Sequence, residues 1–79
     1  MMTKEDIRNA CEQNGLEKGV PFQKGVETWK SYDRKTRQAM RMWFNDNGFE
    51  RVKDDRHGLY KDGVRVNWQE GCANLVISF

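Results

Sequence analysis

Three arginines spaced three and four residues apart are the side chains with the clearest capacity for chemistry in this sequence. Arg34, Arg37 and Arg41 recur at the spacing of one helical face, and Lys35 adds a fourth cation beside them. Guanidinium groups bind phosphates and carboxylates through paired hydrogen bonds. We therefore predict that this row binds an anionic partner, either nucleic acid or an acidic protein surface, without catalysing a reaction.

The arginine row requires a helix, and the residues around it predict one from Ser31 to Gly48. Asp33 is the expected N-cap, and Gly48 is the expected stop at the C-terminal end. Apolar and small residues recur at helical spacing on another face, which predicts a core-facing stripe of Thr36, Ala39, Met40, Trp43 and Phe44.

The positive charges stand at the unfavourable end of this helix. A helix N-terminus carries partial positive charge, so Arg34, Lys35 and Arg37 each cost about 0.3–1 kcal/mol there when exposed. One interpretation is an anion site that combines these cations with the free backbone N–H groups. The alternative is that Asp33 and Glu27 neutralise the cluster within the protein.

The second half of the chain changes to the two-residue period of β-strands. We expect strands at 49–53 and 74–79, a turn at 54–56, and a hairpin around Asp62-Gly63, a pair suited to a type I′ turn. That turn fixes a register in which the expected pairs are Lys61 with Val64, Tyr60 with Arg65, Leu59 with Val66, and His57 with Trp68.

The hairpin register separates a core face from an exposed face. The predicted core face holds Leu59, Val64, Val66 and Trp68, joined by Leu75, Ile77 and Phe79 of the last strand. Tyr60 and Arg65 share the other face with Asn67. An exposed tyrosine beside an arginine is an arrangement used to stack single-stranded nucleic acid, so both are candidate binding residues.

The first half is predicted to be helical. Thr3 and Asp6 form a capping box for a helix that begins near Lys4 and stops at Gly15. Pro21 suits the first position of a second, short helix, in which Phe22, Val26 and Trp29 follow at helical spacing. The predicted fold is a single α+β domain over 1–79, with two to three N-terminal helices packed on a C-terminal antiparallel meander of three to four strands. The helix–helix–hairpin order also resembles a winged helix, with Lys61-Asp62-Gly63 as the wing tip.

Composition narrows the functional classes. The chain has 79 residues, a net charge of +2 and one histidine. No apolar run approaches the ~20 residues of a membrane span, and the N-terminus lacks the apolar segment of a signal peptide. We therefore expect a cytoplasmic protein in which Cys11 and Cys72 are reduced, although they could in principle pair. One histidine and two distant cysteines offer no metal-ligand spacing, so we expect no metal and no cofactor.

The region from Gly48 to Gly63 resembles the HicA-type mRNA interferases, small toxins with a double-stranded-RNA-binding-like fold. The likeness is carried by Gly48, Phe49, Val52, His57, Tyr60, Asp62 and Gly63. It implies that His57, placed just before a strand, cleaves RNA. Arg56 stands where the family has a small residue, and the chain ends at Phe79 without the family's C-terminal helix.

The sequence therefore predicts a small non-enzymatic binding module that engages an anionic partner. A second hypothesis comes from size and character alone: the chain resembles accessory proteins of phages and mobile elements, which inhibit a host or defence protein by stoichiometric binding. Exposed aromatic and arginine side chains would be the contact residues in either case.

Overall fold

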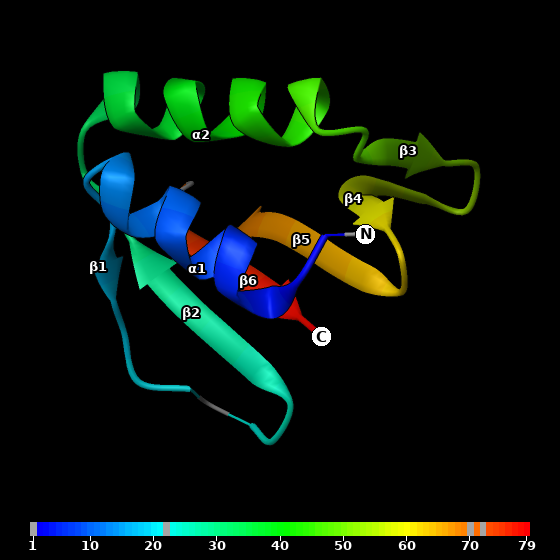
Figure 1. The fold of residues 1–79 in the computed structure, drawn as a ribbon, viewed down its shortest axis with the longest axis horizontal. Helices are drawn as coiled ribbons and strands as arrows, with labels where there is room; N and C mark the ends of the chain where they lie inside the picture. Colours follow the sequence, from blue (N-terminus) through cyan, green and yellow to red (C-terminus); the bar gives the residue numbers. More distant parts are fainter. Residues whose placement is uncertain (1, 22, 70, 72) are drawn as a thin grey trace.

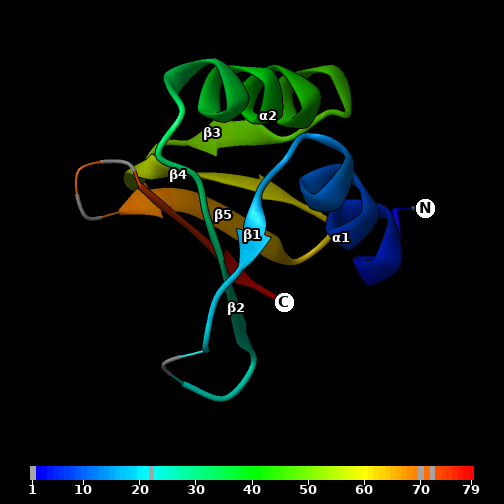
Figure 2. The same cartoon turned by 90° about the vertical axis from the view of Figure 1, so that its left-hand side faces the viewer.

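The computed structural model describes residues 2–21, 23–69, 71 and 73–79. Within these residues the structure has two helices and six strands, which are α1 (Lys4–Gln13), β1 (Glu17–Lys18), β2 (Val26–Lys30), α2 (Arg34–Asp46), β3 (Glu50–Val52), β4 (Asp55–Lys61), β5 (Val64–Gln69) and β6 (Asn74–Ser78). Figures 1 and 2 show both helices on one side of a twisted sheet. The predicted α+β class is confirmed.

All neighbouring strands are antiparallel, in the order β1-β2-β6-β5-β4-β3. The predicted C-terminal meander is present as four consecutive strands, from β3 to β6. Two further strands, β1 and β2, extend the sheet beyond β6, so the strand count exceeds the predicted three to four. The hairpin β4–β5 lies inside this sheet and does not project as a wing, which corrects the winged-helix alternative.

The short helix predicted to begin at Pro21 is wrong. The structure has the strand β2 at Val26–Lys30, paired along its length with β6. Gly25 adopts a φ of +81°, a left-handed turn that a continuous helix would not contain. The first four residues of β2 are all buried, so the strand shows no alternation of apolar and polar residues. Phe22, part of the same prediction, lies outside the described residues.

The caps of both helices are confirmed. The Thr3 hydroxyl accepts the Asp6 N–H at 3.2 Å, and the Asp6 carboxylate accepts the Thr3 N–H at 2.8 Å. Asp33 caps α2 through the N–H of Lys35 at 3.0 Å. Gly48, with a φ of +85°, follows the end of α2 as predicted.

The helices cover the core face of the sheet. Met40 and Phe44 of α2 are fully buried, and they join Val66, Leu75 and Ile77 from the central strands in one apolar cluster. The predicted stripe on α2 is too wide, because Ala39 is exposed. No helix among the described residues is both long enough and apolar enough to cross a bilayer.

The hairpin between β4 and β5 has the predicted turn. Asp62 and Gly63 both have positive φ, at +51° and +79°, as a type I′ turn requires. The paired residues run from Lys61–Val64 to Leu59–Val66, as expected from the turn. The predicted His57–Trp68 pair is not part of this ladder. β4 also begins at Asp55, two residues before the predicted start.

Candidate anion-binding cleft

The arginine row of α2 lies on one surface, as predicted. Arg34, Arg37 and Arg41 line a shallow groove that Gly71 borders from the connection between β5 and β6. Arg34 and Arg41 are exposed, whereas Arg37 is half-buried and donates from Nη1 to the Ser31 carbonyl at 3.0 Å. Lys35 is exposed on α2 but does not line this groove.

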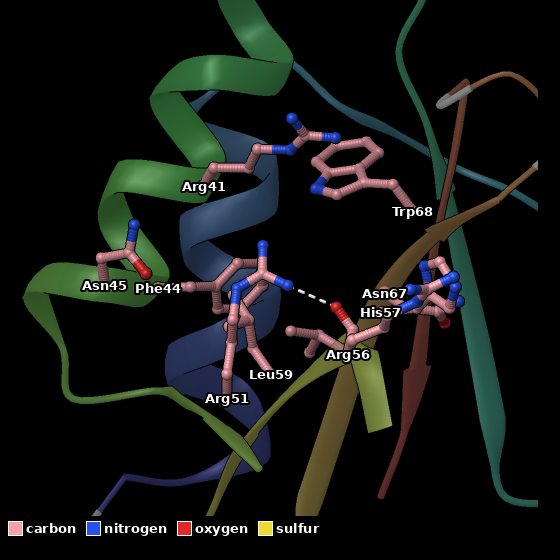
Figure 3. A pocket seen from close by; sticks show the side chains of 10 residues that line it. Arg41, Phe44, Asn45, Arg51, Arg56, His57, Leu59, Asn67 and Trp68 are labelled. Carbon is pink, nitrogen blue, oxygen red and sulfur yellow. Dashed lines mark hydrogen bonds between the residues drawn. The ribbon is translucent and has the colours of Figure 1, made fainter. Parts of the chain in front are cut away.

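Arg41 also lines a larger cleft between α2 and the strands β4 and β5. The cleft encloses about 350 Å³. Figure 3 shows Arg41 and Asn45 on the helix side and Arg56 and His57 on the strand side. The full lining is Arg41, Phe44, Asn45, Arg51, Arg56, His57, Leu59, Val66, Asn67 and Trp68. Because Arg41 borders both hollows, the groove and the cleft form one surface, which we call the basic surface.

The cleft exists because β4 leaves β5 at Leu59. The β4–β5 ladder ends at the Leu59–Val66 pair, and β4 then turns toward β3. There, a single β3 residue, Arg51, faces residues 56–59 of β4 between the Glu50–Tyr60 and Val52–Asp55 pairs. This is an extended β-bulge, a device that redirects side chains and interrupts pairing. Beyond the Leu59–Val66 pair, the described part of β4 offers no paired residue to Trp68, which pairs on its other side with Leu75 of β6.

The Asp55 carboxylate fixes the shape of the bulge. Its Oδ1 accepts the backbone N–H groups of His57 and Gly58, both at 3.2 Å. Its Oδ2 accepts the Tyr60 hydroxyl at 2.5 Å and Arg65 Nε at 2.6 Å. The hydrogen bonds from Arg65 and then Tyr60 hold the pKa of Asp55 well below its usual range. We call Asp55, Tyr60 and Arg65 the Asp55 network.

The Asp55 network gives two predicted binding residues another role. Tyr60 and Arg65 lie on the sheet face opposite the helices, as the register required, and both are partly buried. Their polar atoms are engaged by Asp55, and Arg65 Nη1 also donates to Asn67 Oδ1 at 3.1 Å. Both residues therefore support the bulge from beneath. Whether they contact a partner stays a prediction.

Two contacts hold the cleft walls in place. Arg51 Nη1 donates to the Arg56 carbonyl, which draws the Arg51 side chain against the bulge (Figure 3). On the other side, Lys61 Nζ donates to the carbonyl of Asn47 at 2.5 Å, which ties the end of α2 to the hairpin. A cation at this position also suits the negative end of the helix dipole.

The charge of the cleft is uncompensated by any described carboxylate in its lining. Three arginines and His57 line it, and no Asp or Glu does so among the described residues. Within the same residues, the ion pairs join Arg8 with Glu5 and Glu27, Lys18 with Glu27, and Arg65 with Asp55. None of these pairs uses Arg34, Arg51 or Arg56. A cleft lined by one sign of charge focuses its potential toward an incoming anion.

The structure bears on both interpretations of the α2 N-terminus, an anion site or neutralisation of the cations by Asp33 and Glu27. Asp33 does occupy this end, since its carboxylate accepts the Lys35 N–H and, at 3.2 Å, the Thr36 hydroxyl. Glu27, however, does not neutralise the arginine row. It pairs with Arg8, Oε2 to Nη2, at 2.6 Å beneath α1. Burial opposes its ionisation, but the contacts with Arg8 and Lys18 outweigh that and lower the pKa of Glu27.

We also searched the described residues for a metal site and for a reactive or disulfide-bonded cysteine. They contain no cluster of three or more His, Cys, Asp or Glu side chains that could hold a metal ion. Cys11 is buried in the core without a disulfide, and burial raises the pKa of its thiol to about 12. The pairing of Cys11 with Cys72 cannot be followed, because Cys72 lies outside the described residues.

Sequence reasoning missed half of the cleft. Arg51 and Arg56 carry no periodic pattern, and Trp68 was assigned only to the core. Trp68 is half-buried, with the Arg41 guanidinium carbon 5.7 Å from its ring centroid. The available signal was Arg51 in a predicted strand and Arg56 in the predicted turn that follows it, which places both cations at one end of the sheet.

Comparisons of the chain with protein-family models, with curated proteins and with solved structures found no match. The basic surface itself is therefore the main indication of function.

Proposed function

We propose that this protein is a non-enzymatic binding module that holds nucleic acid on its basic surface. The observation that carries the proposal is the cleft, where Arg41, Arg51 and Arg56 converge from α2, β3 and β4. Arg51 and Arg56 take part in none of the ion pairs among the described residues, so their charge is available to a bound polyanion. The α2 groove continues the same charge over Arg34 and Arg37, giving a track for successive phosphates.

Nucleic acid is favoured over an acidic protein because aromatic and apolar side chains lie beside the cations. Trp68 and His57 offer rings beside the arginines, and Leu59 adds a partly exposed apolar side chain. Phosphates and bases occur together in nucleic acid, which matches this mixture. The alternative partner, a host or defence protein inhibited by stoichiometric binding, would use the same cations and is separated by the experiment below.

The test is a salt titration of binding to a labelled single-stranded oligonucleotide, from about 50 mM to about 200 mM salt. For a single strand, the slope of log K against log salt changes by about 0.7 per phosphate contact. We expect Arg34→Ala/Arg41→Ala and Arg51→Ala/Arg56→Ala each to flatten the slope by about 1.4 and to weaken binding.

The matched control is Lys18→Ala/Lys24→Ala, which removes the same charge at the opposite edge of the sheet, in β1 and the loop after it. It should leave the slope almost unchanged. Equal effects of control and arginine variants would contradict a localised site. No binding at about 50 mM salt would overturn the proposal and leave a protein partner. Cleavage of RNA that is lost in His57→Ala would replace it with the interferase-like activity.

A further inference from the structure

The shape of the cleft can distinguish single-stranded from double-stranded nucleic acid, which charge alone does not do. We infer that the cleft receives one unpaired base of a single-stranded nucleic acid, stacked on Trp68, while Arg51 and Arg56 hold the adjoining phosphate. The inference rests on the proposed function, since it names which form of nucleic acid the basic surface selects and which residue selects it.

The first support is concavity. The arginines of the cleft line a hollow of about 350 Å³, a size within the range of small-molecule sites. Duplex DNA is read by a helix or a β-ribbon that protrudes into a groove. A hollow reaches only what projects from the nucleic acid, and the bases of a duplex remain inside the stack. A base that has left the stack can enter it, as in single-stranded recognition.

The second support is that the lining of the cleft combines apolar and aromatic side chains with the charged ones. Among the apolar lining residues, Leu59 is partly exposed and gives a surface that a phosphate cannot use, whereas Phe44 and Val66 are buried. Trp68 also lines the cleft, partly buried against the core cluster and beyond the last paired residue of the β4–β5 ladder. An aromatic side chain in this setting gives a base a stacking partner, whichever base it is.

The third support is that the ring and the cations are held in fixed positions. The Arg41 guanidinium carbon lies over one face of the Trp68 ring, 5.7 Å from its centroid, and Figure 3 shows the two side chains together at one end of the cleft. A base that stacks on Trp68 therefore displaces this guanidinium or uses the other face of the ring. Arg51 is held by its hydrogen bond to the Arg56 carbonyl, in a bulge that Asp55 closes. Side chains that are already ordered lose less entropy when a ligand binds.

The experiment compares three labelled probes of one length: a single-stranded oligonucleotide, its duplex, and an abasic single strand that keeps the sugar–phosphate backbone. DNA and RNA versions are both used. The inference predicts that the single strand binds about 10-fold more tightly than the abasic strand, because stacking of one base is worth about that factor. The duplex should bind more weakly than the single strand.

The decisive variant is Trp68→Leu. It should bring the affinity for the base-containing strand down to that for the abasic strand, so that the preference is lost. Trp43→Leu is the matched control, because Trp43 is also half-buried but does not line the cleft, and it should keep the preference. If Trp68→Leu loses abasic binding as well through misfolding, Trp68→Phe decides: it keeps a ring and should retain most of the preference.

The outcomes separate the two proposals. Equal affinity for abasic and base-containing strands, or a preference for duplex, would overturn the base-binding inference and leave the polyanion site standing. A preference that survives in a folded Trp68→Leu variant would also overturn it. Failure of every probe to bind at about 50 mM salt would overturn both, and an acidic protein partner would then be the occupant of the basic surface.

Discussion

The Asp55 network and the cleft, which meet at the β4 bulge, differ in whether their charges are paired. In the Asp55 network, the carboxylate is surrounded by hydrogen-bond donors, and Arg65 is paired at 2.6 Å. In the cleft, reached from the same bulge, the arginines have no described carboxylate among the lining residues. Satisfied charges fix a structure, whereas charges of one sign around a hollow create a potential for a ligand. The contrast supports the proposal that the first region is scaffold and the second is the binding surface.

The largest expected effect comes from giving the cleft a carboxylate of its own. Arg56→Glu places a negative charge in the lining of the cleft, where an anion is proposed to bind. We expect affinity for a single-stranded oligonucleotide to fall by about 100-fold, equivalent to about 2.7 kcal/mol, because like charges at an interface are strongly unfavourable. The variant should keep the wild-type Tm or exceed it.

Arg56→Gln is the matched control for this change. It removes the positive charge without adding a negative one, so its loss of affinity should be clearly smaller. Equal affinities for the wild type and Arg56→Glu, measured by fluorescence anisotropy, would show that the cleft does not hold the anion.

The next largest effect is on stability and comes from a steric clash that disrupts the Asp55 network. A Cβ added at Gly58 would lie 2.7 Å from Asp55 Oδ2 and 2.8 Å from Arg65 Nε. Both atoms are engaged in hydrogen bonds, so neither can move without loss. We expect Gly58→Ala to lower the free energy of unfolding by about 1–3 kcal/mol, measured by urea denaturation. An unchanged midpoint would mean that the network contributes little to the fold.

A third prediction tests the same network through pH. The pKa of Asp55 is lowered in the folded protein, so its stabilisation is present above the unfolded-state pKa of about 3.9 and is lost as pH falls through the folded value. Asp55→Asn should therefore have a lower Tm than the wild type near neutral pH, by several degrees. The difference between the two should shrink progressively below about pH 4.

Comparing the two proteins at each pH cancels the titration of other carboxylates, including Glu27, whose pKa is also lowered. A Tm difference that is constant down to about pH 2 would show that ionisation of Asp55 is not what stabilises the bulge.

The smallest effect distinguishes scaffold from contact residue on the sheet face. If Tyr60 serves only the Asp55 network, Tyr60→Leu should leave oligonucleotide affinity within about two-fold of wild type at a temperature where the variant is folded. Trp68→Leu under the same conditions should weaken binding. A comparable loss in both variants would restore the prediction that Tyr60 stacks a base.

Features that depend only on residues close together in the sequence were predicted well. The Thr3–Asp6 capping box, the Asp33 cap and the Asp62-Gly63 turn each depend on hydrogen bonds or backbone angles within a few residues. The hairpin register followed from the turn alone, because a two-residue loop leaves one way to pair the strands. Such local geometry is specified by residue type and needs no knowledge of the rest of the chain.

Features that depend on distant partners were not predicted. The segment Val26–Lys30 has apolar residues at a spacing that also suits a helix, and only its pairing with β6, some fifty residues later, makes it a strand. Exposure of Ala39 likewise depends on where α2 crosses the sheet. The arginine row could be identified from its period, but its joining with Arg51 and Arg56 could not.

The sequence by itself determined that the protein would carry a row of arginines on a capped helix above an antiparallel meander. The tertiary structure decided where that charge converges. It did so because the bulge in β4 parts the sheet beside Trp68, and because Asp55 uses Tyr60 and Arg65 to hold the bulge open. A hollow formed between α2, β3, β4 and β5 is a property of their packing, and no single segment of the chain contains it.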